Sequence, residues 1–258
     1  MPSAASALPQ SQSRPLPRLA IFGDSHYACV RMAHRQGLAS LDRFDVEYWG
    51  HVGKRFRFLD YRDEAIVPAD DYTADRFAKF NDRGRRFLPV ADFDAVLFVG
   101  CRLYVSHLFM MAAQARADGD FLSTGLMARL ARDTFANSTT YGFACRFAAT
   151  GRARILFSPP SLPTAGLPHG WEAAYPAATA SGDAGDSARL WASLVRIAAE
   201  DGVTFLPQPA HTVTGAVLTH PDFGVENCLE TGDMEHKNPA YGAAVLAAAL
   251  QALPGWGG

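Results

Sequence analysis

Short apolar runs alternate with longer segments of helical periodicity along most of this chain, and this alternation limits its possible folds more than any other feature. Runs rich in Val, Ile, Leu and Phe are typical of strands that are covered on both faces. Strands separated by helices predict right-handed crossovers and a parallel sheet. The predicted strands are residues 19–22, 46–49, 95–99, 153–157 and 203–206. The predicted helices are residues 27–38, 104–117, 121–149, 187–201 and 239–253.

Five parallel strands predict a flavodoxin-like three-layer α/β/α sandwich. We expect residues 18–258 to form a single domain and residues 1–17, rich in Ser, Ala, Pro and Gln, to form a flexible tail. Residues 54–89 are polar and aromatic, and we expect an irregular excursion with short helical turns. Residues 159–186 are rich in Pro, Gly and Ala, and we expect a long loop of the kind that often serves as a lid.

The composition excludes several classes of partner and cofactor. A formal net charge of -2 argues against nucleic acid or an anionic membrane surface as a partner. No apolar run is long enough to span a bilayer, and the N-terminus lacks the features of a secretory signal. We therefore expect a cytoplasmic protein with reduced cysteines, and we make no prediction of its oligomeric state. No cofactor or metal is expected, because nucleotide-binding glycine motifs and metal-ligand spacings are absent from the sequence.

Residues 23–26 read Gly-Asp-Ser-His, directly after the first predicted strand and directly before the first predicted helix. Ligands of open parallel sheets bind beyond the carboxyl ends of the strands, which is where Ser25 is expected to lie. At the start of a helix its hydroxyl and its own N–H can both face a substrate, and the helix dipole favours developing negative charge. The alternative is structural: Asp24 or Ser25 caps the helix, and Gly23 permits the turn.

Asp233 and His236 precede Asn238-Pro239, a pair typical of a helix N-cap followed by proline at the first helical position. A spacing of three lets one turn place both side chains on the same side. Asp233 can then hold the Nδ1–H of His236 while Nε2 faces Ser25, which is the division of roles in a serine triad. The alternative is a surface loop whose polar residues are incidental.

Gly23-Asp24-Ser25, followed far downstream by Asp233-x-x-His236 before the last helix, resembles the SGNH (GDSL-type) hydrolase superfamily. The resemblance implies a flavodoxin-like sandwich in which Ser25, His236 and Asp233 are the catalytic residues of an esterase, lipase, thioesterase or O-acyltransferase. His26 resembles a variant found among sugar O-acyltransferase-like members. The sequence Ser-Pro-Pro at 158–160 lies where the family often has a proline turn.

The resemblance also implies an oxyanion hole, built from a glycine after the second strand and a Gly-x-Asn block after the third. The first is Gly50 or Gly53, and Gly53 is preferred because Gly50 can simply end the strand. The second block begins at Gly100, with Arg102 where asparagine is expected. Arg102 carries enough donors to stabilise an oxyanion, and its alternative role is to bind a carboxylate or phosphate of the substrate.

Two basic clusters are candidates for attracting an anionic substrate, and such clusters are more often solvated faces. One combines cations with aromatic residues after the second strand, and the other consists of arginines alone. Their cations are Lys54, Arg55 and Arg57 in the first cluster and Arg83, Arg85 and Arg86 in the second.

These features predict a serine-dependent ester hydrolase or O-acyltransferase that acts on an acyl ester or thioester of a small molecule or glycan. Water as the acceptor makes it an esterase, and a sugar hydroxyl makes it an O-acyltransferase. The alternative, motivated by Arg102, is a catalytically silent module of the same fold that binds a glycan or an anionic metabolite. A flavin-binding flavodoxin-like protein is a third hypothesis.

Overall fold

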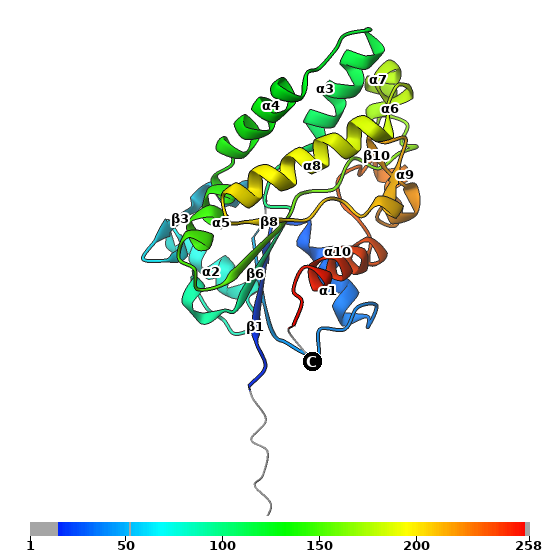
Figure 1. Cartoon of the computed structure of the whole chain (residues 1–258). Coiled ribbons are helices and arrows are strands. Elements are labelled where there is room, and N and C mark those ends of the chain that lie inside the picture. The colour runs from blue at the N-terminus through cyan, green and yellow to red at the C-terminus, as the bar shows by residue number, and fades with distance from the viewer. Residues whose placement is uncertain (1–14, 52, 256–258) are drawn as a thin grey trace, which may run out of the picture.

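The computed structural model describes residues 15–51 and 53–255. Its central sheet has five strands in the order β2-β1-β6-β7-β8, and every neighbouring pair is parallel (Figure 1). The predicted α/β sandwich with five parallel strands is confirmed, and this strand order is the flavodoxin-like one. The strands are β1 (Arg18–Gly23), β2 (Asp45–Gly50), β6 (Ala95–Val99), β7 (Arg154–Ser158) and β8 (Thr204–Phe205).

Continuous apolar sequence produces the central strands because both faces of the sheet are covered by helices. All five residues of β6 are buried, and Ile21 and Phe22 of β1 are fully buried. Gly23 at the end of β1 pairs with Gly50 of β2 and with Val99 of β6. The carboxyl ends of these three strands therefore lie level with one another, at the edge where the sheet order reverses.

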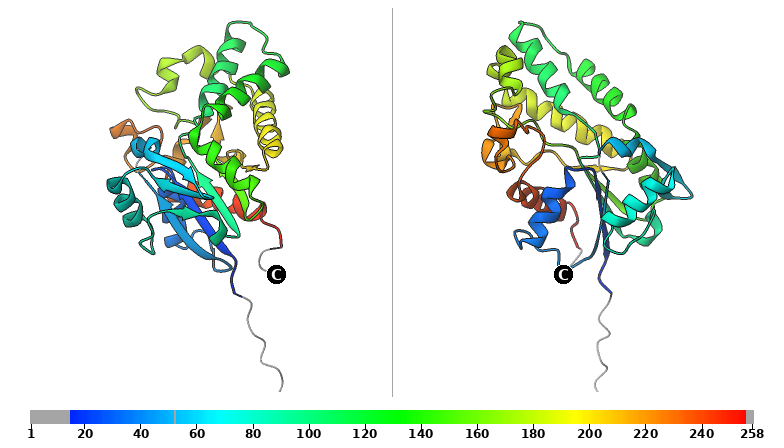
Figure 2. Two further views of the ribbon diagram at one scale, coloured as in Figure 1. Left: turned by 90° about the vertical axis from the view of Figure 1, so that its left-hand side faces the viewer. Right: turned by 180° about the vertical axis from the view of Figure 1, so that it is seen from behind.

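The two faces of the sheet carry separate hydrophobic cores. Figure 2 shows helices on both sides of the sheet. Helices α1 (Tyr27–Arg35) and α10 (Pro239–Gln251) cover one face. Helices α5 (Thr139–Ala149) and α8 (Ala184–Glu200) belong to the core on the other face. The larger core includes stacked aromatic rings such as those of Phe98 and Phe157, whose centroids are 5.6 Å apart.

The single helix predicted at 121–149 is wrong, because the structure has two helices there. Helix α4 (Thr124–Ala136) ends at Asn137, and α5 begins after Ser138. The Ser138 side chain accepts from the N–H of Tyr141, which is the N-cap hydrogen bond that begins a new helix.

Residues 54–89 are more regular than the predicted irregular excursion. A three-stranded antiparallel sheet, β3-β4-β5, and one full helix, α2, occupy most of the segment. Ile66, Phe77 and Leu88 are fully buried beneath it, so its few apolar side chains join the main core. The elements are η1 (Gly53–Phe58), β3 (Leu59–Arg62), β4 (Ala65–Pro68), α2 (Asp71–Phe80), β5 (Leu88–Pro89) and η2 (Val90–Asp92).

Residues 159–186 are also not wholly a loop. Two short helices, α6 (Trp171–Ala174) and α7 (Pro176–Ala180), lie in this segment, and α8 already begins at its end because Asp183 caps the N–H of Asp186. The remaining elements are α3 (Ser106–Ala117), η3 (Ala210–Thr212), β9 (Val213–Thr214), β10 (Leu218–Thr219), η4 (Pro221–Phe223) and α9 (Cys228–Thr231).

The part of the predicted N-terminal tail at residues 1–14 lies outside the described residues. The carbonyl of Pro17 accepts from the N–H of Asp45, so the chain is already tied to β2 at that point. Among the helices of the described residues, none is both long and apolar enough to cross a bilayer.

Helices α1 and α10 approach each other closely at Gly242. A Cβ atom at this position would lie 2.1 Å from the carbonyl oxygen of Cys29 and 2.7 Å from the nitrogen of Val30. The backbones of the two helices are therefore in direct contact, and no side chain fits between them. This contact places the N-terminus of α1, after Ser25, beside the N-terminus of α10, after His236.

We expect Gly242→Ala to lower the free energy of unfolding by about 2–3 kcal/mol, because the added methyl must push the two helices apart. Gly142→Ala is the matched control, since Gly142 also lies in a helix but has open space at its Cβ position. Alanine has the higher helix propensity, so the control should be neutral or more stable by about 0.5–1 kcal/mol. Urea denaturation of both variants measures the difference. Equal stabilities would contradict the role of Gly242.

Candidate active site

Ser25 lies at the tip of the tight connection between β1 and α1. Gly23 is required at the end of β1, because a Cβ atom there would lie 2.4 Å from the carbonyl oxygen of Val99. The next residues turn directly into the helix, with the N–H of Ala28 donating to the carbonyl of Ser25 over 3.2 Å. Ser25 is exposed, whereas Asp24 before it and His26 after it are buried. The hydroxyl of Ser25 is therefore accessible on a rigid support.

The loop before α10 brings His236 and Asp233 to Ser25. Nε2 of His236 lies 2.8 Å from Oγ of Ser25, across 211 residues of sequence. Nδ1 of His236 lies 2.8 Å from Oδ2 of Asp233. With the Nδ1 proton held by Asp233, Nε2 accepts from the Ser25 hydroxyl. The three side chains predicted to work together are thus joined by hydrogen bonds.

The position of the loop is fixed by hydrogen bonds of its own. Oδ1 of Asp233 accepts from the backbone N–H groups of Glu235 and His236, over 3.1 and 3.0 Å. As the sequence predicts, Asn238 caps α10 by accepting from the N–H of Tyr241, and Pro239 is the first helical residue. The short turn from Asp233 to α10 therefore leaves the imidazole little freedom.

The environment of Asp233 favours its ionised form. Partial burial raises the pKa of this carboxyl, but hydrogen bonds from the backbone and ring of His236 and from the N–H of Glu235 outweigh burial and lower the pKa overall. A carboxylate that keeps its charge can orient the imidazole and stabilise its protonated form.

Asp24 connects the ends of β1 and β6 and is only 1% exposed. Its Oδ1 accepts from the backbone N–H of His26 over 3.1 Å and from Nδ1 of that ring over 2.7 Å. Its Oδ2 accepts from the backbone N–H of Arg102 over 3.1 Å. The sequence offered only a helix cap as the structural role of Asp24. Its contact with Arg102 spans 78 residues, and no local pattern indicates it.

The turn after β6 has three consecutive residues with positive φ: Gly100 (73°), Cys101 (53°) and Arg102 (57°). Such backbone is costly for Cys and Arg, and it persists where surrounding contacts fix it. A Cβ atom at Gly100 would lie 2.5 Å from Oδ1 of Asp24, so this position also needs glycine for close approach. The N–H of Gly100 donates to the carbonyl of Ser158 and is not available to a substrate.

The two glycines considered for the oxyanion hole have different surroundings. A Cβ atom at Gly50 would lie 2.5 Å from the ring of Tyr27, so that glycine makes room for a buried aromatic side chain. At Gly53 the nearest atom is Nη1 of Arg102, at 3.1 Å from the Cβ position. Gly53, the glycine preferred from the sequence, is therefore a neighbour of Arg102. Within the described part of the chain, the backbone N–H groups of Ser25 and Gly53 donate no hydrogen bond to another protein group.

The imidazole of His26 forms the back wall of the site. It lies against the ring of His236, with centroids 5.4 Å apart and an interplanar angle of 27°. It also contacts Tyr104 edge-on, with centroids 6.2 Å apart. The Asp-x-His spacing at 24–26 was visible in the sequence, but its role in supporting His236 depends on the packing of α10.

Lys237 is a buried residue of the site that sequence reasoning missed, since nothing beyond its position next to His236 indicates it. Its side chain is 7% exposed, and Nζ donates to the carbonyls of Met234 and Glu235 over 2.8 and 3.0 Å. Burial lowers the pKa of this ammonium from 10.5 to about 8, although Asp233 opposes the shift. Lys237 therefore holds the loop that carries Asp233 and His236.

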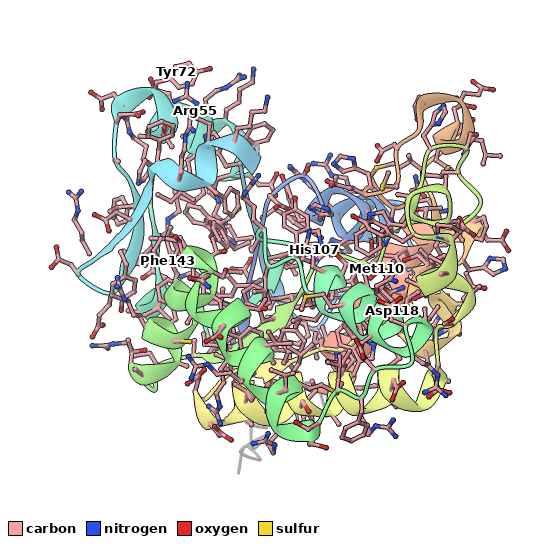
Figure 3. The ribbon with its side chains drawn as sticks, turned by 90° about the horizontal axis from the view of Figure 1, so that it is seen from above. Arg55, Tyr72, His107, Met110, Asp118 and Phe143 are labelled. Atoms are coloured by element: carbon pink, nitrogen blue, oxygen red, sulfur yellow. The ribbon has the colours of Figure 1, made fainter. Side chains whose placement is uncertain are left out.

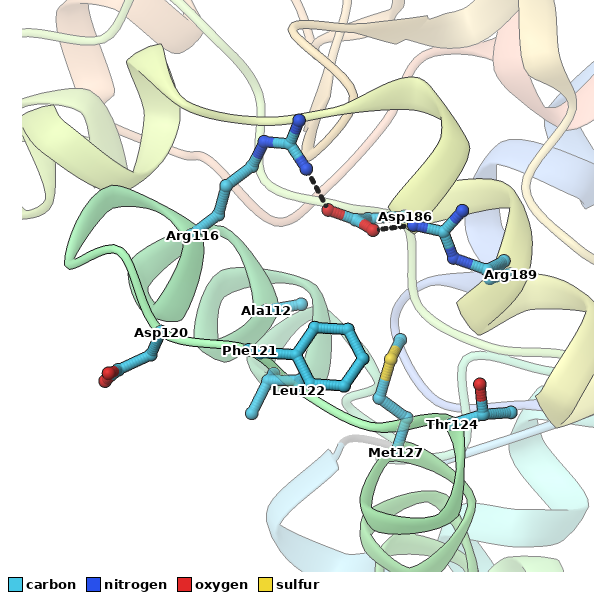
Figure 4. Close-up of a pocket in the computed structure, with 9 residues that line it drawn as sticks. All are labelled: Ala112, Arg116, Asp120, Phe121, Leu122, Thr124, Met127, Asp186 and Arg189. Carbon is cyan, nitrogen blue, oxygen red and sulfur yellow. Dashed lines mark hydrogen bonds and ion pairs between the residues drawn. The ribbon is translucent and has the colours of Figure 1, made fainter.

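A pocket of about 380 Å³, whose lining does not include Ser25 or His236, lies between α3, α4 and α8 (Figure 4). Arg116 and Arg189 in its lining both pair with Asp186, and Phe121 and Met127 also line it. Its lining includes no histidine that could act as a base. In the described residues, no group of three or more His, Cys, Asp or Glu side chains is arranged to hold a metal ion.

Comparison with known proteins gives a distant structural similarity. No family model matches the chain, and no curated protein matches it. The crystal structure of a DUF4886 family protein from Bacteroides uniformis aligns with 93% of this chain and 83% of its own, with 10% sequence identity and a TM-score of 0.46. A similarity at this level assigns neither a family nor an activity.

We expect the wild-type protein to gain stability relative to Lys237→Met as the pH rises from about 8 towards 10.5. Over this range the folded lysine loses its proton while the unfolded lysine keeps it, so the unfolded state binds more protons and unfolding becomes less favourable. The full shift corresponds to about 3 kcal/mol. Denaturant unfolding of both proteins at pH 7 and at pH 10 measures it, and the difference between them cancels the other titrating groups. A difference that does not change with pH would contradict a buried, charged Lys237.

Proposed function

We propose that this protein is a serine-dependent ester hydrolase or O-acyltransferase that acts on an acyl ester or thioester. The observation that carries the proposal is the hydrogen-bonded series Asp233–His236–Ser25, with both contacts of the imidazole at 2.8 Å. Its position at the carboxyl ends of β1 and β6, where the sheet order reverses, is where open α/β sheets bind ligands. The resemblance of the sequence blocks to SGNH hydrolases agrees with this function.

In the proposed reaction Oγ of Ser25 attacks the carbonyl carbon, and its proton passes to Nε2 of His236. Asp233 holds Nδ1–H and stabilises the imidazolium. Nε2–H then protonates the leaving oxygen or sulfur, which leaves an acyl group on Ser25. A water or sugar hydroxyl gives its proton to the same nitrogen and attacks the acyl group, which releases the product and restores the serine.

The negative charge that develops on the carbonyl oxygen needs donors, and the proposed ones are the N–H of Ser25, the N–H of Gly53 and the guanidinium of Arg102. The two N–H groups donate to no acceptor among the described residues. Nη1 of Arg102 lies 3.1 Å from the position that a Cβ atom of residue 53 would take. Donors fixed in position before the reaction cost no reorganisation during it.

Arg102 also favours a second candidate function, a catalytically silent module that binds a glycan or an anionic metabolite. An exposed guanidinium stands where the resembled family has an amide. Such a module has no need of an activated serine, so labelling of Ser25 distinguishes the two functions.

We expect a fluorophosphonate to add once to the wild-type protein, and we expect Ser25→Ala and His236→Ala to prevent the addition. Intact-mass spectrometry measures the adduct. With 4-nitrophenyl acetate, Ser25→Ala should reduce turnover by about a thousandfold or more. A wild-type protein that forms no adduct and turns over the ester no faster than Ser25→Ala would favour the silent module.

Asp233→Asn should reduce kcat by roughly 10³–10⁴-fold, because an amide no longer selects the imidazole tautomer that accepts from Ser25. Asp222→Asn is the matched control, since Asp222 pairs with the exposed His220 over 3.4 Å and no serine completes that pair. Ester hydrolysis by the two variants, each normalised to the wild type, checks the assignment. Similar losses in both would indicate a general effect of charge removal.

A further inference from the structure

Four cationic side chains near Ser25 have no carboxylate partner. They are Lys54, Arg55, Arg57 and Arg102, and all are exposed or half-exposed. Within residues 15–51 and 53–255, none of them forms an ion pair with an aspartate or glutamate. Unpaired like charges in one place repel each other, so they add nothing to stability by themselves.

The second basic cluster, which looked equivalent in the sequence, is neutralised. Arg83 pairs with Asp45 and Glu47, and Arg85 pairs with Glu47 and Asp92. Arg86 pairs with Asp71 and Asp75, both at 2.8 Å. These arginines hold structure together and have little charge to offer a ligand. Of the two clusters, only the one beside Ser25 is free to bind an anion.

The chain places this free cluster next to the reacting groups. Gly53 lies beside the Arg102 guanidinium, and Arg102 is bonded through its N–H to Asp24, the residue before Ser25. Lys54 and Arg55 follow Gly53 directly in η1. The cluster therefore begins beside the proposed oxyanion site and extends along η1 to the contact of Arg55 with Tyr72.

Aromatic rings hold the arginines of the cluster in place. The guanidinium of Arg55 lies 4.5 Å from the ring centroid of Tyr72 and 5.0 Å from that of Phe58. The guanidinium of Arg57 lies 5.0 Å from the same Phe58 ring. Figure 3 shows Arg55 beside Tyr72 on the segment formed by η1 and α2. Contact with a ring leaves the charge of each guanidinium in place, and the planar N–H fork of arginine matches the oxygens of a phosphate or carboxylate.

The acidic residues nearest to this cluster do not neutralise it. Asp70 affects Arg55 electrostatically, but its carboxyl caps α2 by accepting from the N–H of Thr73 over 2.6 Å. Glu235 and Asp24 raise the pKa of Tyr104 in addition to the effect of burial, and Arg102 opposes them, so both carboxyls act in the surroundings of Arg102. The remaining unpaired charge is that of Lys54, Arg55 and Arg57 on η1.

We propose that the ester or thioester bound at Ser25 carries an anionic group, a phosphate or a carboxylate, which Lys54, Arg55 and Arg57 bind. This inference rests on the proposed function and names its substrate class. A phosphate and a carboxylate both present negatively charged oxygens, and in this substrate they lie away from the reacting carbonyl.

Two pairs of substrates test the proposal, each with the same reacting group and a different charge. The phosphate pair is acetyl-coenzyme A and S-acetylpantetheine, followed by thiol release. The carboxylate pair is 4-nitrophenyl hemisuccinate and its methyl ester, followed by nitrophenolate release. In at least one pair, the wild-type protein should show kcat/KM about tenfold or more higher for the anionic member. The pair that discriminates identifies the source of the anion.

The variant Lys54→Gln, Arg55→Gln, Arg57→Gln should bring that ratio close to one while hydrolysis of the neutral member changes little. Arg129→Gln, Arg132→Gln, Arg196→Gln removes the same number of positive charges from exposed arginines paired with Asp133 or Glu200, and this control should keep the wild-type ratio. Arg55→Lys with Arg57→Lys keeps the charge but loses the planar fork, so the ratio should fall only in part. The salt dependence of the wild-type ratio needs no variant, and the preference should weaken at high salt.

A binding experiment distinguishes a failure of the proposed anion site from a failure of the proposed chemistry at Ser25. Coenzyme A should bind Ser25→Ala protein about tenfold or more tightly than pantetheine does by isothermal calorimetry, and loss of the three cations should abolish the difference. The same comparison with the monomethyl and dimethyl esters of succinic acid covers a carboxylate. A fluorophosphonate adduct on Ser25 with no anion preference in any of these pairs would overturn the inference alone. Cation-dependent binding with no adduct would retain the anion site and reject the chemistry.

Discussion

The contact between α1 and α10 is the interaction on which the candidate site depends. Ser25 precedes one helix and His236 precedes the other, and the 2.8 Å distance between Oγ and Nε2 follows from how those helices are placed. Gly242 allows the two backbones to touch, because any side chain there would meet the carbonyl of Cys29. Direct backbone contact leaves less room for sliding than an interface of flexible side chains does. A glycine at the contact between the two helices therefore controls the geometry of the Ser25–His236 pair.

A second constraint acts within the sheet and fixes the other wall of the site. The carboxyl oxygens of Asp24 accept from His26 and Arg102, so one buried side chain joins the turn after β1 to the turn after β6. The left-handed residues 100–102 are unfavourable in isolation, and the bonds from Asp24 and the close approach at Gly100 offset that cost. The backbone that carries the Arg102 side chain is therefore fixed. A hydrogen-bond donor proposed for an oxyanion hole needs such rigid support.

Sequence reasoning predicted those features that depend on local pattern. The central strands were predictable because burial on both faces leaves continuous apolar runs, and the Asp233–His236 turn because Asn238-Pro239 marks the start of a helix. The side sheet at 59–89 was missed because its strands are short and partly exposed, so none of them gives an apolar run long enough to indicate a strand. The sequence favoured Gly53 over Gly50 only because Gly50 can end a strand, and the filling of the space at Gly50 by the Tyr27 ring could not be seen there. Asp24 and Lys237 act through distant or backbone partners, which no spacing encodes.

The two basic clusters have similar sequences but differ in whether their cations are paired with carboxylates. Arg83 and Arg85 surround Glu47, a fully buried carboxyl on β2 whose isolation would be costly, so their charges are used in the fold. Lys54, Arg55 and Arg57 follow the other end of β2, after Gly50, where Asp70, the carboxyl that acts on Arg55, is engaged as the cap of α2. The guanidinium groups of Arg55 and Arg57 lie against the rings of Tyr72 and Phe58, which do not neutralise them. Charge that is held in place but not paired is a cost to the folded protein alone, and the cost is recovered when an anion binds.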